Sequence, residues 1–136
     1  MGSNKFLTGL MKQTDHTSAI QSFVIACSDE TTLLTTGTKS TFRMPYQFTV
    51  TEVRASLTTV ATGSTVIIDI HEAGTTILST KITIDAGEST STTAATPPVI
   101  NDPNLADDAQ MTIDIDQIGS SNAGKGLKVY IIGKIA

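Results

Sequence analysis

Cysteine, tryptophan and proline, three residue types that often point to a particular class of protein, are scarce or absent in this sequence. Its 136 residues contain one cysteine, no tryptophan and 4 prolines. The single cysteine, Cys27, leaves no partner for a disulfide within the chain. A domain of this length can bury roughly 68–70% of its unfolded surface, so it needs no disulfide or metal to fold. The sequence therefore predicts one compact domain, and no motif in it calls for a cofactor.

Positive charge is also scarce. Lysine and arginine together number 9 against 13 acidic residues, which gives a net charge of −4 and a pI of about 4.9. We therefore expect no nucleic-acid partner and no anionic membrane surface as a partner. No apolar run approaches the roughly 20 residues of a membrane helix, and residues 1–18 lack the apolar stretch of a signal peptide. We expect the protein to be made and folded in a cytosol.

Threonine, serine and isoleucine dominate what remains. The branched Cβ of threonine suits a pleated strand and its hydroxyl tolerates water, so alternation of threonine with isoleucine makes strands with one dry and one wet face. Such strands, interrupted by short turns, are expected over these ranges: 19–27, 32–36, 39–42, 48–59, 65–72, 76–84, 90–93, 99–100, 111–115 and 127–135.

This spacing predicts an all-β fold, a jelly-roll-like antiparallel β-sandwich over residues 19–136 that is preceded by a short N-terminal arm of residues 1–18. An immunoglobulin-like sandwich is the alternative, although its cysteine and tryptophan marks are missing. In the arm, Phe6, Leu7, Leu10 and Met11 recur on one side of a short helical turn. We interpret them as partner-binding anchors, with a frayed terminus as the alternative.

Paired polar residues in two expected strands are the first candidates for chemistry. Asp69 and His71 lie opposite the apolar Ile68 and Ile70, and the pair Asp114 and Asp116 alternates with isoleucine in the same way. Such pairs suit a shared metal or an acid/base pair, but the simpler interpretation is the wet face of a strand. The segments 68–74 and 113–119 also share the pattern I-D-I-x-x-x-G.

The remaining candidates are weaker. Clustered carboxylates in loops suit calcium, and Asp102, Asp107 and Asp108 are of this kind, although they lack an EF-hand order. Cys27 has a catalytic alternative with His16 or His71, but it ends an apolar run and is expected to be a buried, inert thiol. The two arginines, Arg43 and Arg54, are expected to be surface charges, with an intersubunit ion pair as the alternative. The sequence predicts no enzyme.

One stretch and several later blocks carry a family resemblance. Residues 42–56, FRMPYQFTVTEVRAS, resemble a segment of structural proteins of tailed phages, notably phages of aquatic bacteria. The later blocks are ILSTK (77–81), IDAGE (84–88), LADD (105–108), IDIDQIG (113–119) and GLKV (126–129). The resemblance does not cover residues 1–18 and has no catalytic signature. It implies a virion protein, made in the bacterial host cytoplasm, with a β-sandwich that assembles as a homotrimer.

A short arm followed by one sandwich favours a capsid decoration or cement protein, with the major capsid protein or another virion protein as its partner. The alternative is a head or tail fibre or adaptor protein whose loops bind a host receptor or another tail protein. Sugar sites favour exposed aromatic rings, and aromatics make up only 4% of this chain. Tyr46 is the better receptor contact of the two tyrosines, Tyr46 and Tyr130. An enzyme acting on surface polysaccharide would need a pair of carboxylates at a characteristic separation.

Overall fold

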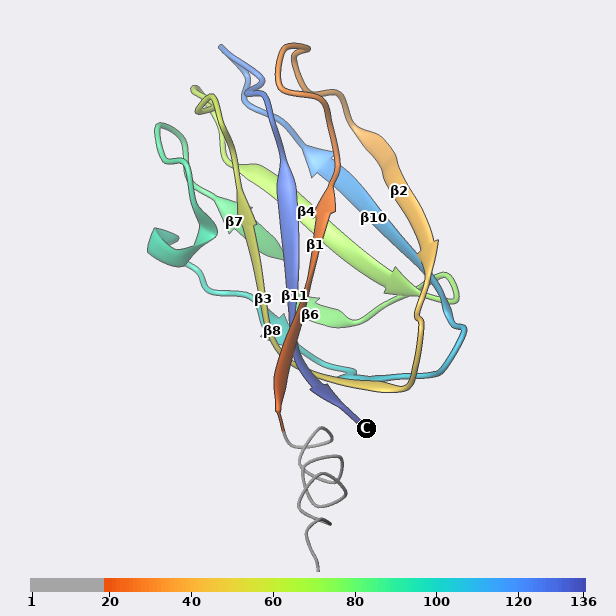
Figure 1. The fold of residues 1–136 in the computed structure, drawn as a ribbon. Coiled ribbons are helices and arrows are strands. Elements are labelled where there is room, and N and C mark those ends of the chain that lie inside the picture. Colours follow the sequence, from red (N-terminus) through yellow and green to blue (C-terminus); the bar gives the residue numbers. More distant parts are fainter. Residues whose placement is uncertain (1–18) are drawn as a thin grey trace, which may run out of the picture.

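The computed structural model describes residues 19–136, which form two antiparallel sheets packed face to face (Figure 1). The strands are β1 (Ile20–Ala26), β2 (Gly37–Arg43), β3 (Phe48–Ser56), β4 (Val66–Glu72), β5 (Thr75–Thr76), β6 (Leu78–Thr80), β7 (Ile82–Ile84), β8 (Val99–Ile100), β9 (Asn104–Leu105), β10 (Gln110–Gln117) and β11 (Lys128–Ile135). The Phe6, Leu7, Leu10 and Met11 anchors of the predicted arm lie outside the described residues.

The order of the strands is that of a jelly roll. One sheet runs β1-β11-β3-β9, and the other runs β2-β10-β4-β5 with β7 also beside β4. β6 and β8 form a separate two-stranded ribbon. The chain enters the first sheet at β1, crosses to the second at β2, and continues to change sheets up to β11. The prediction of an all-β, jelly-roll-like antiparallel sandwich is confirmed.

The alternation of side chains explains which residues form the core. In β4, Val66, Ile68 and Ile70 are fully buried between the sheets, as the sequence predicts. From the facing sheet, Val129 and Ile131 of β11 are equally buried. Thr49, Glu52 and Arg54 of β3 point to solvent or lie partly exposed, so the threonine-rich positions form the outer surface of the first sheet.

Three of the expected strands are not single strands. Residues 32–36 form a loop, because the carboxylate of Asp29 accepts hydrogen bonds from the amides of Thr31 and Thr32 and closes a turn. Residues 90–93 form a 3₁₀ turn over Ser91–Thr93, with the hydroxyl of Thr90 as its cap. In both places a polar side chain competes with the ladder for backbone groups.

Residues 76–84 form parts of three strands instead of one. β5 and β7 pair with β4, whereas β6 between them pairs with β8. The chain therefore leaves the second sheet and returns to it within a few residues. This excursion covers one side of β4, which decides the environment of the polar residues described next.

Candidate functional site

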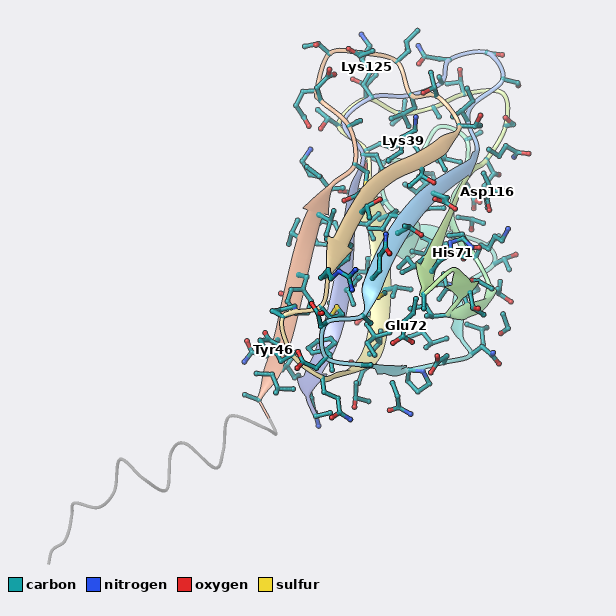
Figure 2. All side chains as sticks on the ribbon, turned by 90° about the vertical axis from the view of Figure 1, so that its right-hand side faces the viewer. Lys39, Tyr46, His71, Glu72, Asp116 and Lys125 are labelled. Carbon is teal, nitrogen blue, oxygen red and sulfur yellow. The ribbon has the colours of Figure 1, made fainter. Side chains whose placement is uncertain are left out.

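A cluster of polar side chains lies on the outer face of the second sheet, and we call it the β4–β10 cluster. It consists of Asp69 and His71 from β4, Asp114 and Asp116 from β10, and Lys81 between β6 and β7. Figure 2 shows His71 and Asp116 on this face, on the side of the sandwich away from β1. The structure thus brings together both polar pairs that the sequence singles out.

The pairing of β4 with β10 places two carboxylates directly opposite each other. Asp69 is the register partner of Asp114, and the repeated I-D-I segments are therefore neighbours in one sheet. Like charges in such cross-strand positions repel. The imidazole of His71 lies between them, with Nε2 at 3.5 Å from Oδ2 of Asp69 and Nδ1 at 3.3 Å from Oδ2 of Asp114. The ring thus lies against both acidic groups.

Lys81 supplies the positive charge of the cluster. Its Nζ lies 2.6 Å from Oδ2 of Asp116 and 3.7 Å from Oδ2 of Asp69. The hydrogen bond to Asp116 raises the pKa of the Lys81 ammonium. One lysine therefore links a carboxylate of β10 to a carboxylate of β4, and it comes from the segment that covers β4.

Asp69 contradicts the simpler interpretation of a wet strand face. Its exposed fraction is 3%, and it accepts hydrogen bonds from the amide of Ile70 at 2.9 Å and from the hydroxyl of Thr76 at 2.5 Å. The covering segment that begins at β5 supplies Thr76, so the burial is caused by a contact that the alternation in β4 does not reveal. Asp116, in contrast, is exposed as expected.

The order of groups in this cluster does not match a nucleophilic triad. In a triad the imidazole lies between a carboxylate and the attacking hydroxyl. Here the carboxylate of Asp69 lies between the Thr76 hydroxyl and the His71 imidazole, and the other side of the ring faces Asp114. Within residues 19–136, no three histidine, cysteine or acidic side chains are arranged to hold a metal ion. The contacts in this cluster therefore connect β4, β10 and the covering segment that carries Lys81.

The loop carboxylates Asp102 and Asp108 interact with nearby residues, and the thiol of Cys27 is buried. Asp102 accepts a hydrogen bond from the Asn104 amide at 3.2 Å, and Asp108 lies 3.8 Å from Nη1 of Arg43. Cys27 is 4% exposed, and burial raises the pKa of its thiol to about 11. A thiol with such a pKa carries little thiolate near neutral pH, so it is a poor nucleophile. His71, its suggested partner, belongs to the cluster on the other sheet.

Tyr46 packs against other aromatic rings. Its ring centroid lies 5.9 Å from that of Phe23 and 6.3 Å from that of Phe48, and these two phenylalanines meet edge to face at 5.0 Å. Phe48 is fully buried, whereas Phe23 and Tyr46 are partly buried against the core. Figure 2 shows Tyr46 at the end of the sandwich where β1 begins. Tyr46 therefore presents only part of its ring to a ligand.

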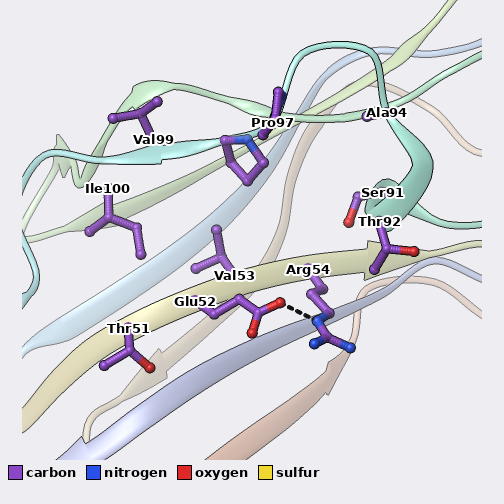
Figure 3. A pocket seen from close by; sticks show the side chains of 11 residues that line it. Thr51, Glu52, Val53, Arg54, Ser91, Thr92, Ala94, Pro97, Val99 and Ile100 are labelled. Carbon is purple, nitrogen blue, oxygen red and sulfur yellow. Dashed lines mark hydrogen bonds and ion pairs between the residues drawn. The ribbon is translucent and has the colours of Figure 1, made fainter.

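A groove with a mixed lining runs along β3. It has a volume of about 780 Å³ and lies between Thr51–Arg54 and the segment 91–100. Figure 3 shows Glu52 and Arg54 side by side at its edge, where they form an ion pair. This pairing satisfies both charges, and the opposite wall is formed by prolines and by Val99 and Ile100.

An apolar strand borders the open side of the sandwich between β1 and β2. Ile20 and Val24 of β1 are 72% and 60% exposed. Behind them, a groove of about 610 Å³ is lined by Phe23, Ile25 and Phe42, together with Arg43, Pro45 and smaller side chains of both strands. Sequence reasoning placed strands here but missed this exposed apolar face. The signal available was the uncharged run from residue 19 to residue 27.

Comparisons with known proteins give no family. No family model matches the chain, and no curated protein matches it. Among solved structures, the Drosophila NLP-core, a structure described as providing insight into pentamer formation and histone binding, is similar with a TM-score of 0.45 and 8% identity over 85% of this chain and 97% of that one. A structure of the infectious bursal disease virus Gx strain is similar with a TM-score of 0.31 and 13% identity over 86% of this chain and 37% of that one.

The described part of the chain also contains no helix of the length and hydropathy needed to span a bilayer. The class that its architecture defines is an all-β jelly-roll sandwich with one apolar strand at its open edge.

Proposed function

We propose that this protein is a structural protein of a tailed-phage virion, and more specifically a capsid decoration or cement protein. It binds the assembled shell through the arm of residues 1–18 and stabilises the shell. Its partners are the major capsid protein or other virion proteins, and it acts as a homotrimer on the particle. The resemblance of residues 42–56 and of the later blocks to such proteins supports this proposal.

The observation that carries the proposal is the apolar surface at the point where residues 1–18 join the sandwich. Ile20, the first residue of β1, is 72% exposed, and Val24 is 60% exposed. Exposed apolar patches of this kind mark protein contacts. Phe6, Leu7, Leu10 and Met11 precede them in the sequence, so one continuous stretch of chain carries apolar groups suited to a protein partner.

Stabilisation of the shell then follows from mass action. A protein that binds only the assembled shell shifts the equilibrium towards it, by about 2.7 kcal/mol per site at a concentration one hundred times the dissociation constant. A homotrimer carries three arms, and simultaneous docking of several weak arms raises the overall affinity. The shell is therefore expected to withstand heat better when the protein is bound.

The test is binding of purified protein to shells that lack it. The full chain should co-sediment with expanded shells and raise their melting temperature. A variant in which Phe6, Leu7, Leu10 and Met11 are all serine should stay folded and lose both effects. A matched variant with four polar arm residues, Lys5, Thr8, Lys12 and Gln13, changed to serine should keep them. Normal binding by the first variant would contradict the role of the arm.

Copy number on the particle separates this function from the fibre or adaptor alternative. Hundreds of copies on the shell, counted by electron cryomicroscopy, support a decoration protein. A few copies at a vertex or on the tail support a fibre or adaptor, whose receptor contact would then be sought in the loops near Tyr46. The packing of Tyr46 against Phe23 and Phe48 favours the decoration protein.

A further inference from the structure

β1 is an edge strand whose outer backbone groups have no partner strand. It pairs with β11 along its whole length, and the described part of the chain supplies no strand on its other side. The amide of Cys27 donates to the carbonyl of Leu127 in β11. Because backbone direction alternates along a strand, Ser22, Val24 and Ala26 direct their N–H and C=O groups to the free side.

The sequence of β1 does nothing to protect this edge. Its seven residues, IQSFVIA, include no charge, proline or glycine, and its pairing with β11 has no bulge. Proteins usually block free edges with such features or keep the edge strands very short. The facing edge strand, β2, carries Lys39 and Arg43 and a bulge, and the edge strands β5 and β9 have two residues each.

Both faces of β1 also expose apolar side chains. Val24 and Ile20 point outwards, and Phe23 and Ile25 are half-buried beside the groove that Phe42 helps to line. A strand added at this edge would therefore gain backbone hydrogen bonds and bury apolar surface on both sides of the sheet. The groove beside β1 includes Arg43 of β2 in its lining, but β1 itself is uncharged, whereas β3 carries the ion pair of Glu52 and Arg54.

We propose that β1 binds β1 of a second copy of this chain, in antiparallel pairing about a two-fold axis at Phe23. This register places Ser22 opposite Val24 of the partner subunit and Ile20 opposite Ala26 of the partner subunit. It pairs the outward backbone groups of Ile20, Ser22, Val24 and Ala26 with those of the same four residues in the second copy. The two four-stranded sheets of the pair then become one continuous sheet across the axis.

The unprotected edge itself favours a second copy as the occupant. A second copy offers the same seven-residue edge with free backbone groups, so one contact covers both unprotected edges. Each copy has a net charge of −4, but β1 is uncharged, so pairing β1 with itself places no like charges opposite each other. An isologous contact of this kind closes as a dimer and does not continue as a fibre. The inference goes beyond the proposed function and does not depend on it: the dimer is the form of the free protein in solution, whereas the homotrimer proposed above forms on the particle.

The experiment measures the mass of the full chain by sedimentation between about 1 and 100 µM. The wild type should be a dimer in the upper part of this range. Val24→Lys places a charge beside the axis and should weaken the dimer at least tenfold, because the two lysines then lie diagonally across the axis and the apolar contact of Val24 is lost. Val99→Lys is the matched control, since Val99 has a similar exposed fraction of 51% and lies away from β1. It should leave the dimer unchanged.

A second readout is hydrogen exchange of the backbone amides. In the monomer the amides of Ser22, Val24 and Ala26 face solvent and exchange fast, whereas in the dimer they should be protected. Protection should rise with protein concentration in the wild type and be lost at Ser22 and Ala26 in Val24→Lys. Both measurements are made on folded protein, which circular dichroism verifies.

A wild type that stays monomeric at 100 µM would overturn the inference, and so would any oligomer whose mass and amide protection are unaffected by Val24→Lys. The proposed function fails separately. Loss of shell binding in the arm variant with the dimer intact bears on the arm alone, and a dimer that does not bind shells contradicts only the decoration role.

Discussion

Asp69 shows how one residue type has opposite environments on neighbouring strands. Its carboxylate is buried and receives two hydrogen bonds, whereas Asp116 of β10 is exposed. Alternation within β4 predicts the direction in which Asp69 points. It does not predict that Thr76 and Lys81, from a segment that leaves and re-enters the sheet, will cover it.

The first prediction concerns this burial. Asp69→Ala removes the acceptor of the Ile70 amide and leaves the Thr76 hydroxyl only its longer bond of 3.2 Å to the Leu78 carbonyl. We expect a loss of about 2 kcal/mol in the free energy of unfolding. Asp69→Asn keeps an acceptor oxygen and removes the repulsion from Asp114, so its loss should be smaller. Urea unfolding at pH 7 measures both. Equal losses in the two variants would show that the charge, and not the acceptor, determines the stability.

The pH dependence of one turn follows from Asp29. Its carboxylate accepts hydrogen bonds from the amides of Thr32 and Thr31, and these bonds lower its pKa below the ordinary 3.8. A carboxyl group whose pKa is lowered by folding stabilises the fold above its ordinary pKa, and this stabilisation is lost as the pH falls through the lowered value.

Asp29→Asn tests this dependence. The wild type should melt at a higher temperature than Asp29→Asn at pH 7, because the ionised carboxylate is the stronger acceptor. The difference should shrink as the pH falls below 3.8. A difference in melting temperature that stays constant from pH 7 to acid pH would mean that ionisation of Asp29 does not contribute.

At the scale of elements, β3 and β11 meet unusually closely at one position. A Cβ atom added at Gly133 would lie 2.0 Å from the carbonyl oxygen of Thr49 and 2.8 Å from the ring of Phe48. The register of β3 and β11 shifts beside this glycine, between Ile132 and Gly133. The close approach therefore explains the glycine in the interior of this strand.

We expect Gly133→Ala to cost about 3 kcal/mol, since the backbone of β3 must move to admit the methyl group. Gly74→Ala is the control. Gly74 has a φ of +84° and no heavy atom within 4 Å of an added Cβ, so its cost of about 1 kcal/mol comes from conformation alone. Thermal unfolding of both variants gives the comparison. A loss at Gly133 no larger than the loss at Gly74 would contradict the steric argument.

Elements differ in how far the sequence reveals them. The alternation of Ile68 and Ile70 with Asp69 and His71 predicts β4 and its inward face, and the structure agrees, since Ile68 and Ile70 are fully buried. Residues 90–93 have the composition of a strand, but the Thr90 hydroxyl bonds to the Thr92 amide and makes a turn. Local sequence patterns reflect burial and β propensity. They do not reveal where a side chain forms a hydrogen bond with a backbone amide that would otherwise bond to a neighbouring strand.

At the scale of the whole molecule, β11 holds the first sheet together. It lies between β1 and β3 and pairs with both over most of its length. Ile20 at the start of β1 is the register partner of Lys134, so the pairing joins the two ends of the described chain. The sequence does not reveal this order, because pairing between distant strands leaves no local pattern.

This arrangement predicts that a chain ending at residue 126 does not fold, since β1 and β3 lose their common neighbour. A chain that starts at residue 19 keeps every described strand and should unfold cooperatively, like the full chain. Circular dichroism during heating distinguishes the two truncations. Cooperative unfolding of the chain that ends at residue 126 would contradict the central role of β11.

The central place of β11 has a consequence during synthesis. β1 is among the first parts of the sandwich to leave the ribosome, and it waits without its neighbour until Lys128–Ile135 has been made. During this interval its uncharged sequence is a template for other unpaired strands, including those of sister chains on the same messenger. The order of strands therefore leaves β1 open to association with other nascent chains until the last strand has been made.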